Sequence, residues 1–231
     1  MDDIIDCPSP NFDEREQPIS MVVLHYTGMK DAASAIERLC DPDARVSCHY
    51  LIDEDGKVLR MVPEAKRAWH AGRSYWRGLH EVNGASIGIE IVNPGHEFGY
   101  RPFPKPQMEA LLPLLADIVE RRQIPPANVV GHSDVAPARK QDPGELFDWA
   151  MLAKRRLAVA RPTKCLVDPD WTDSGFLLAL ERYGYDVQDG LAATVAFQRR
   201  FRPELIDGTV DGECRAILLQ LLLDRERGHA R

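Results

Sequence analysis

The sequence predicts an α/β fold, with a mixed central sheet flanked by helices, followed by a small three-helix C-terminal domain. Over residues 1–160, short apolar runs typical of buried strands alternate with amphipathic stretches typical of helices. Two apolar runs flank Asp55-Gly56, which is a strong signal of a β-hairpin. After Arg161-Pro162-Thr163 only helical patterns remain. We therefore expect one domain at 1–160 and a helical domain at 163–231.

The first half of the chain supplies most of the expected strands. Residues 1–20 are polar and rich in proline, and predict an extended lead-in. Apolar spacing predicts a helix over 31–40. The expected strands are MVVLHY at 21–26, the hairpin pair CHYLID at 48–53 and KVLRMV at 57–62, and ASIGIEIVN at 85–93.

The second half is mainly helical. Residues 107–122 repeat apolar side chains every three or four positions and predict a helix, with Pro113 as a local kink. NVVGH at 128–132 predicts a strand, and ELFDWAMLAKRRL at 145–157 predicts a helix. Three amphipathic stretches near residues 172–187, 191–201 and 211–223 predict the helices of the C-terminal domain.

The bulk composition excludes several classes of partner. The net charge of −7 provides no basic surface for nucleic acid or anionic lipid. The longest apolar stretches, such as 217–223, are far shorter than the roughly 18 to 20 residues of a membrane span. The acidic N-terminus lacks the features of an export signal, and five scattered cysteines suggest free thiols. We therefore expect a cytoplasmic protein, or a periplasmic one if an export signal is missing from this chain.

Three side chains carry the main chemical signal. His25 ends one apolar run, His132 ends another, and Asp142 follows within KQDPG. Two imidazoles and one carboxylate form the ligand set of a catalytic zinc site, in which the fourth position stays open for water. Zn²⁺ lowers the pKa of bound water to about 7 and polarises a carbonyl. Spacing alone leaves the alternative that these are ordinary hydrogen-bonded histidines.

Five sequence motifs in order resemble the type 2 N-acetylmuramoyl-L-alanine amidases. They are VVLHYT at 22–27, RVSCHYLID at 45–53, AWHAG at 68–72, SIGIEIVN at 86–93 and GHSDVAPARKQDPG at 131–144. The resemblance covers about residues 15–160, and the last motif is long and specific. It implies hydrolysis of the amide between N-acetylmuramic acid, or its anhydro form, and L-alanine. The implied substrates are muropeptides, other peptidoglycan fragments or murein.

The resemblance also implies roles by position. His25, His132 and Asp142 match the ligands of Zn²⁺, Glu90 matches the residue that activates water, and Lys140 matches the cation that stabilises the oxyanion. The alternative for Lys140 is an ordinary surface lysine. Glu90 lies among isoleucines, so its carboxylate needs either an open sheet face or a function.

Four further positions resemble substrate-binding residues. Trp69 and His70 match a segment that lines the substrate groove, although Trp69 could equally pack in the core. Arg45 and Arg139 match positions that bind carboxylates of the stem peptide, as a guanidinium can through two parallel hydrogen bonds. The alternative for both arginines is a surface salt bridge. His49, which matches no ligand position, is expected to be structural.

The tail resembles a three-helix peptidoglycan-binding domain, on the segments ALERYGYDV, AATVAFQRRFRP and IDGTVDGECRAIL. Its first helix departs from the usual pattern because it lacks a common glutamine, so the tail could instead be a stabilising cap. The rival function is a non-catalytic peptidoglycan recognition protein on the same fold. Such proteins typically lose a metal ligand, whereas all three positions are filled here. The sequence does not indicate the oligomeric state.

Overall fold

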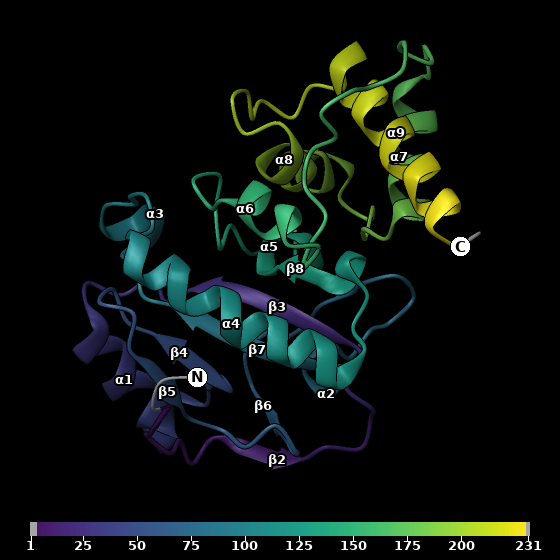
Figure 1. Ribbon diagram of the computed structural model, residues 1–231. Helices are drawn as coiled ribbons and strands as arrows, with labels where there is room; N and C mark the ends of the chain where they lie inside the picture. Colours follow the sequence, from purple (N-terminus) through teal and green to yellow (C-terminus); the bar gives the residue numbers. More distant parts are fainter. Residues whose placement is uncertain (1–3, 230–231) are drawn as a thin grey trace.

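The computed structural model describes residues 4–229 and confirms the predicted α/β fold with a mixed sheet (Figure 1). The strands are β1 (Ile5–Asp6), β2 (Phe12–Glu14), β3 (Met21–Tyr26), β4 (Tyr50–Ile52), β5 (Val58–Arg60), β6 (Lys66–Ala68), β7 (Ser86–Ile91) and β8 (Val129–Gly131). The helices are α1 (Ala32–Cys40), α2 (Val82–Ala85), α3 (Gly95–Phe98), α4 (Lys105–Arg122), α5 (His132–Val135), α6 (Trp149–Lys154), α7 (Asp173–Tyr183), α8 (Gly190–Phe201) and α9 (Gly212–His229).

The central sheet has the strand order β1-β5-β4-β7-β3-β8. Strands β4, β7, β3 and β8 are parallel to one another, and the expected hairpin pairs β4 with β5 in antiparallel orientation. Strands β2 and β6 form a separate antiparallel ribbon. Because the carboxyl ends of β3, β7 and β8 meet at one edge, side chains far apart in sequence come together there.

Successive side chains of β7 alternate between a face that packs in the hydrophobic core and a face that carries Glu90. Ile87, Ile89 and Ile91 are fully buried in one cluster with the apolar side of α4, which lies across that face (Figure 1). Successive strand residues point to opposite faces, so the intervening Ser86, Gly88 and Glu90 belong to the other face. The carboxylate of Glu90 therefore does not compete with the isoleucines for the same core.

The opposite side of the sheet is covered by α1 and by the C-terminal helices. Leu51 of β4 packs with Ala35 and Leu39 of α1. Val23 of β3 and Val130 of β8 belong to the same buried cluster as residues of all three tail helices, which are Phe176, Phe197 and Ile217 among others. The tail thus shares a hydrophobic core with the larger part of the chain.

The local structure departs from the sequence predictions mainly in short segments, and the four-residue helices α2, α3 and α5 were not expected. The helix expected over 145–157 is shorter, because the Asp148 side chain accepts the N–H of Met151 at 2.8 Å and starts α6 at Trp149. The lead-in contributes β1 and β2, and β6 was not expected. These strands have two or three residues, too few for an alternation pattern to be recognised.

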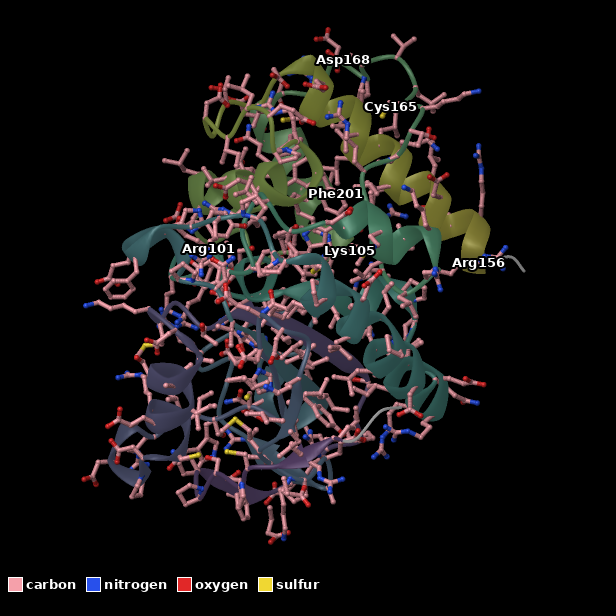
Figure 2. The ribbon with its side chains drawn as sticks, turned by 60° about the vertical axis from the view of Figure 1, so that its left-hand side comes forward. Arg101, Lys105, Arg156, Cys165, Asp168 and Phe201 are labelled. Atoms are coloured by element: carbon pink, nitrogen blue, oxygen red, sulfur yellow. The ribbon has the colours of Figure 1, made fainter. Side chains whose placement is uncertain are left out.

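The segment 155–172 connects α6 to α7 without a helix or strand. In Figure 2 its residues Cys165 and Asp168 lie at the outer end of the tail, whereas Phe201 lies on the inner side. Asp168 forms an ion pair with Arg215 of α9 at 2.6 Å, which holds the connection against the tail. No helix within residues 4–229 is long and apolar enough to cross a membrane.

Candidate metal centre

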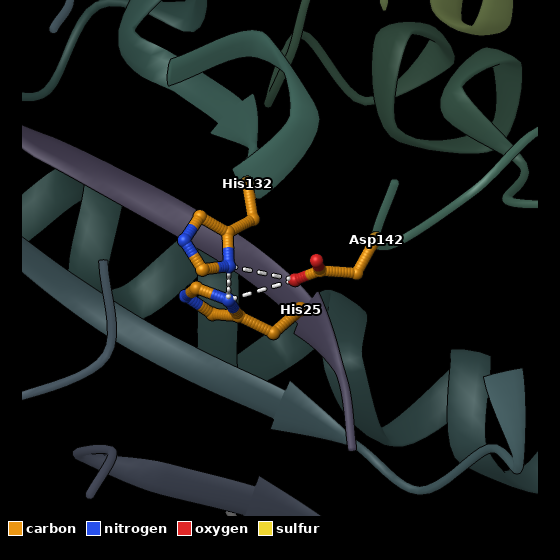
Figure 3. A group of neighbouring side chains, drawn as sticks. All are labelled: His25, His132 and Asp142. Atoms are coloured by element: carbon orange, nitrogen blue, oxygen red, sulfur yellow. Dashed lines mark hydrogen bonds and ion pairs between the residues drawn. The ribbon is translucent and has the colours of Figure 1, made fainter. Parts of the chain in front are cut away.

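Three predicted side chains converge at the carboxyl edge of the sheet (Figure 3). The Nδ1 atoms of His25 and His132 lie 2.9 Å apart. Oδ2 of Asp142 lies 2.9 Å from Nδ1 of His25 and 3.0 Å from Nδ1 of His132. All three residues are buried. Three polar atoms therefore form a small triangle.

Different elements deliver these three residues. His25 lies near the end of β3, His132 begins α5 directly after β8, and Asp142 lies in the following loop. The N–H of Ser133 donates to the carbonyl oxygen of Asp142 at 2.8 Å, which ties the loop to α5. A Cβ atom on Gly131 would lie only 2.7 Å from Cδ of Pro143, so glycine is needed for this close approach.

Nε2 of His25, the ring nitrogen that points away from the triangle, belongs to a chain of hydrogen bonds that includes His70 and Ser86. The Ser86 hydroxyl donates to the carbonyl oxygen of Val82 at 2.5 Å, so its oxygen can only accept from Nε2–H of His70, at 3.1 Å. Nδ1 of His70 then carries a lone pair and accepts from Nε2–H of His25 at 3.0 Å. The remaining nitrogen of His25, Nδ1, therefore has a lone pair.

His132 has the same tautomer for a simpler reason. Its Nε2 lies 3.0 Å from the carbonyl oxygen of Ala71, which can only accept a hydrogen bond. Nε2 is therefore protonated, and Nδ1 of the neutral ring carries a lone pair. Two nitrogen lone pairs and one carboxylate oxygen then face one another without a proton between them. A cation at the centre would satisfy all three, and this donor set is the one expected for catalytic Zn²⁺.

The electrostatics of the site agree with neutral rings for His25 and His70. Burial, reinforced by the nearby His132, lowers the pKa of His25 to about 4. Burial alone would raise the pKa of Asp142, but the adjacent imidazoles, when they are protonated, outweigh it by their positive charge and hold this pKa below its ordinary value, so Asp142 is a carboxylate. Burial also lowers the pKa of His70 well below 6.5. The candidate ligands thus include the neutral ring of His25 and the Asp142 carboxylate at neutral pH.

A cavity of about 610 Å³ opens onto this centre. Glu90 and Lys140 both line it, together with the three converging residues. Oε2 of Glu90 is shielded from solvent and has no hydrogen-bond partner in the described part of the chain. Burial, reinforced by the Asp142 carboxylate, raises the pKa of Glu90 well above its ordinary value. Glu90, the expected acid–base residue, and Lys140, the residue expected to stabilise the oxyanion, therefore lie at the same cavity as the candidate metal centre.

The four expected substrate-binding residues differ in how they are placed relative to the cavity. Trp69 is half-buried and lines the cavity, and the guanidinium of Arg45 lies 5.7 Å from the centre of its ring. Arg139 also lines the cavity, but its Nη2 already donates to the carbonyl oxygens of Ala71 and Arg73. His70 lies behind His25, where it holds the ring by a hydrogen bond as well as lining the cavity.

A second cluster of side chains, which was not expected from the sequence, lies at the cavity rim. The Tyr26 hydroxyl lies 2.9 Å from Nδ1 of His96, and Nε2 of His96 lies 3.1 Å from the Glu145 carboxylate. The His96 ring also stacks on Tyr100 at 4.3 Å between centroids. Tyr26 lies in the motif at 22–27, whereas His96, Tyr100 and Glu145 lie outside the five motifs. Only their contacts in the fold could reveal them.

Comparison with known proteins identifies the family of this chain. Residues 15–145 match the family described as N-acetylmuramoyl-L-alanine amidase. The chain is 38% identical over 234 aligned positions to the N-acetylmuramoyl-L-alanine amidase AmiD of Escherichia coli K12, with 88% of this chain and 82% of AmiD covered. It is 34% identical to the 1,6-anhydro-N-acetylmuramyl-L-alanine amidase AmpD of the same organism, with 68% of this chain and 92% of AmpD covered.

A solved structure extends the similarity over the tail. The complex of Escherichia coli AmiD with anhydro-N-acetylmuramic acid-L-Ala-D-gamma-Glu-L-Lys superposes with a TM-score of 0.81 at 34% identity. The match covers 94% of this chain and 98% of the AmiD chain, so the C-terminal helices are included.

Proposed function

The chain belongs to the N-acetylmuramoyl-L-alanine amidase family, and from that premise we propose how it cleaves the amide between N-acetylmuramic acid and L-alanine. In this proposal His25, His132 and Asp142 hold a Zn²⁺ ion, Glu90 transfers protons, and Lys140 stabilises the oxyanion. When bound, Zn²⁺ supplies a Lewis acid that activates water and polarises the scissile carbonyl.

The observation that supports this proposal most is the triangle of lone pairs. Without a cation, Nδ1 of His25, Nδ1 of His132 and Oδ2 of Asp142 would repel one another at 2.9–3.0 Å in a buried site. Burying polar atoms in this way is costly unless a partner of opposite charge compensates them. We infer that the site is built for a divalent cation and not for structural hydrogen bonding.

In the proposed reaction, each of the residues at the cavity has a separate role. The Glu90 carboxylate takes a proton from the attacking water and returns it to the departing nitrogen. Lys140 offers a positive charge to the developing oxyanion. The carbon–nitrogen bond breaks, the water oxygen stays on the lactyl carbonyl carbon of the sugar, and L-alanine leaves with a free amino group. The products are a muramic acid carboxylate and an intact stem peptide.

We propose anhydro-muramyl peptides and other murein fragments as substrates, and the similarity to the AmiD–substrate complex supports this proposal. The half-buried Trp69 offers a flat apolar surface to a sugar ring at the cavity wall. Arg45 beside it and Arg139 are the candidates for binding stem-peptide carboxylates.

Product analysis tests this function directly. We expect the purified protein to release an intact tripeptide with a free L-alanine amino group from anhydro-N-acetylmuramic acid-L-Ala-D-γ-Glu-L-Lys, and chelation to stop the reaction. Cleavage inside the peptide would instead indicate a peptidase. Absence of both turnover and stoichiometric zinc would indicate a recognition protein. Intact sacculi, offered in parallel, would show whether polymeric murein is also cut.

Two further expectations stay proposals. We propose that the tail, 163–231, adds affinity for murein, which a sacculus pull-down of wild type against a tail-surface variant would test. We also propose a cytoplasmic location, because all five cysteines are free thiols. Cell fractionation would decide between this and the periplasm.

A further inference from the structure

The segment that carries His132 is held in place from the C-terminal helices. We infer that Arg200 of α8 and Tyr185, which precedes α8, are positioning residues for the His132 side of the metal centre. This inference rests on the proposed metal site. It assigns the AFQRRF segment of α8 a role inside the active-site architecture, in addition to any role in binding murein.

Asp134 is the link between the tail and His132. It lies two positions after His132, and its Oδ2 accepts the N–H of Gly131 at 2.8 Å. This bond closes the first turn of α5 around the residue that supplies Nδ1 to the site. The Asp134 carboxylate is almost completely buried, so its conformation depends on the partners it finds there.

The tail supplies those partners. Nη1 of Arg200 donates to Oδ2 of Asp134 at 2.5 Å, and the Tyr185 hydroxyl donates to Oδ1 at 2.6 Å. Arg200 and Tyr185 are themselves buried, and helices α5 and α8 lie against each other (Figure 1). Both carboxylate oxygens of Asp134 are thus satisfied by residues more than 50 positions further along the chain.

Arg200 also contacts the other end of the same segment. Its Nη2 donates to the carbonyl oxygen of Val129, the first residue of β8, at 3.1 Å, and to that of Val159 at 2.8 Å. Its guanidinium lies 3.8 Å from the ring centre of Trp149. A single planar group therefore brackets the chain from the start of β8 to the first turn of α5, with His132 between the two contacts.

This arrangement has a specific consequence for the metal. Removing a residue that orients a metal ligand from outside the coordination sphere typically weakens metal binding by about 10- to 100-fold. If Arg200 or Tyr185 is changed, Asp134 loses a partner in a buried site and the α5 turn loses its fixed position. We therefore expect zinc affinity to fall, even though neither residue touches the metal ligands.

The test compares full-length variants by zinc affinity, measured by competition with a chromophoric chelator. Arg200→Met removes the guanidinium contacts with Asp134, Val129, Val159 and Trp149. Arg200→Lys keeps the positive charge but loses the planar guanidinium group. Tyr185→Phe removes only the hydroxyl that donates to Asp134. We expect weakening of about 10- to 100-fold for Arg200→Met, less for Tyr185→Phe, and partial rescue by Arg200→Lys. The visible spectrum of the Co²⁺-loaded protein should also change, because it reports the geometry of the ligands.

Two controls separate positioning from general stability. Ile217→Ala opens a cavity in the buried core of the tail and removes no hydrogen bond to Asp134 or β8. Arg182→Met removes an exposed arginine whose partner is Glu226. We expect both to keep wild-type zinc affinity, although Ile217→Ala lowers the unfolding temperature.

The outcomes are distinct. Wild-type zinc affinity in Tyr185→Phe would overturn the inference, even if Arg200→Met failed to fold. Equal weakening in Ile217→Ala would also overturn it, because the effect would then be global. A wild-type protein without stoichiometric zinc would overturn the proposed metal site, and this inference with it.

Discussion

His25 and Glu90 are direct register partners on the neighbouring parallel strands β3 and β7. Partners in a parallel pair present their side chains on the same face of the sheet. Both residues line the same cavity as a result. The strand pairing alone thus brings a metal ligand and the proposed proton-transfer residue to one site.

Replacing Glu90 by glutamine should separate catalysis from metal binding. Glutamine keeps the shape of the side chain but cannot accept and return a proton, so we expect kcat to fall by about 10²- to 10⁴-fold. Zinc content should stay stoichiometric, because Glu90 is not one of the three converging residues. Glu109→Gln, an exposed change on α4, is the matched control. Wild-type turnover in Glu90→Gln would contradict the assignment.

Asp142→Ala should remove the metal itself. The variant loses the only anionic atom of the triangle, so its zinc affinity should fall by more than the roughly 10- to 100-fold that an outer partner contributes. Thermal unfolding with and without zinc provides the measurement. Zinc at about 100 times the dissociation constant should stabilise the wild type by about 2.7 kcal/mol. Asp117→Ala, which removes a partly exposed carboxylate paired with Arg121, should respond like the wild type.

His70 should affect zinc affinity through the tautomer of His25. His70→Leu removes the acceptor for Nε2–H of His25, and we expect zinc binding to weaken by about 10- to 100-fold. His70→Asn places an amide oxygen near the position of Nδ1 and should recover part of the loss. The ring packs directly over Gly88, where a Cβ atom would collide with it. Equal affinity of the two variants would argue against the hydrogen-bond chain.

His49 should make stability depend on pH. Burial, reinforced by the Arg15 guanidinium, lowers its pKa from 6.5 to about 4 in the folded protein. Between these values the unfolded chain binds more protons than the folded chain. The contribution is therefore fully present above pH 6.5 and is lost as the pH falls towards 4, by roughly 3 kcal/mol.

Urea unfolding at several pH values, in the presence of chelator, measures this dependence. His49→Asn keeps an acceptor for the N–H of Gly88, which donates to Nδ1 of His49 at 3.0 Å. We expect the variant to be less stable at neutral pH but to lose less stability on acidification. Because both proteins keep His25, its titration cancels in the comparison. An identical slope in the two proteins would assign the acid sensitivity to other groups.

Much of the fold was predictable because its signals are local. The apolar runs of β3 and β7, the turn at Asp55-Gly56 and the periodicity of α4 depend on neighbouring residues, and all appear in the structure. The failures occur where local signals are weak. The strand β6 is three residues long, and α6 starts late because the side chain of Asp148 caps it there.

The sequence by itself determined the family, the α/β fold and the residues that converge on the candidate metal centre, because these follow from local patterns and specific motifs. The tertiary structure alone decided how that centre is supported. The contacts of His25 with His70, of Tyr26 with His96 and of Asp134 with Arg200 join residues 45, 70 and 66 positions apart. Such pairs depend on strand order, register and the docking of the tail, which no local periodicity encodes.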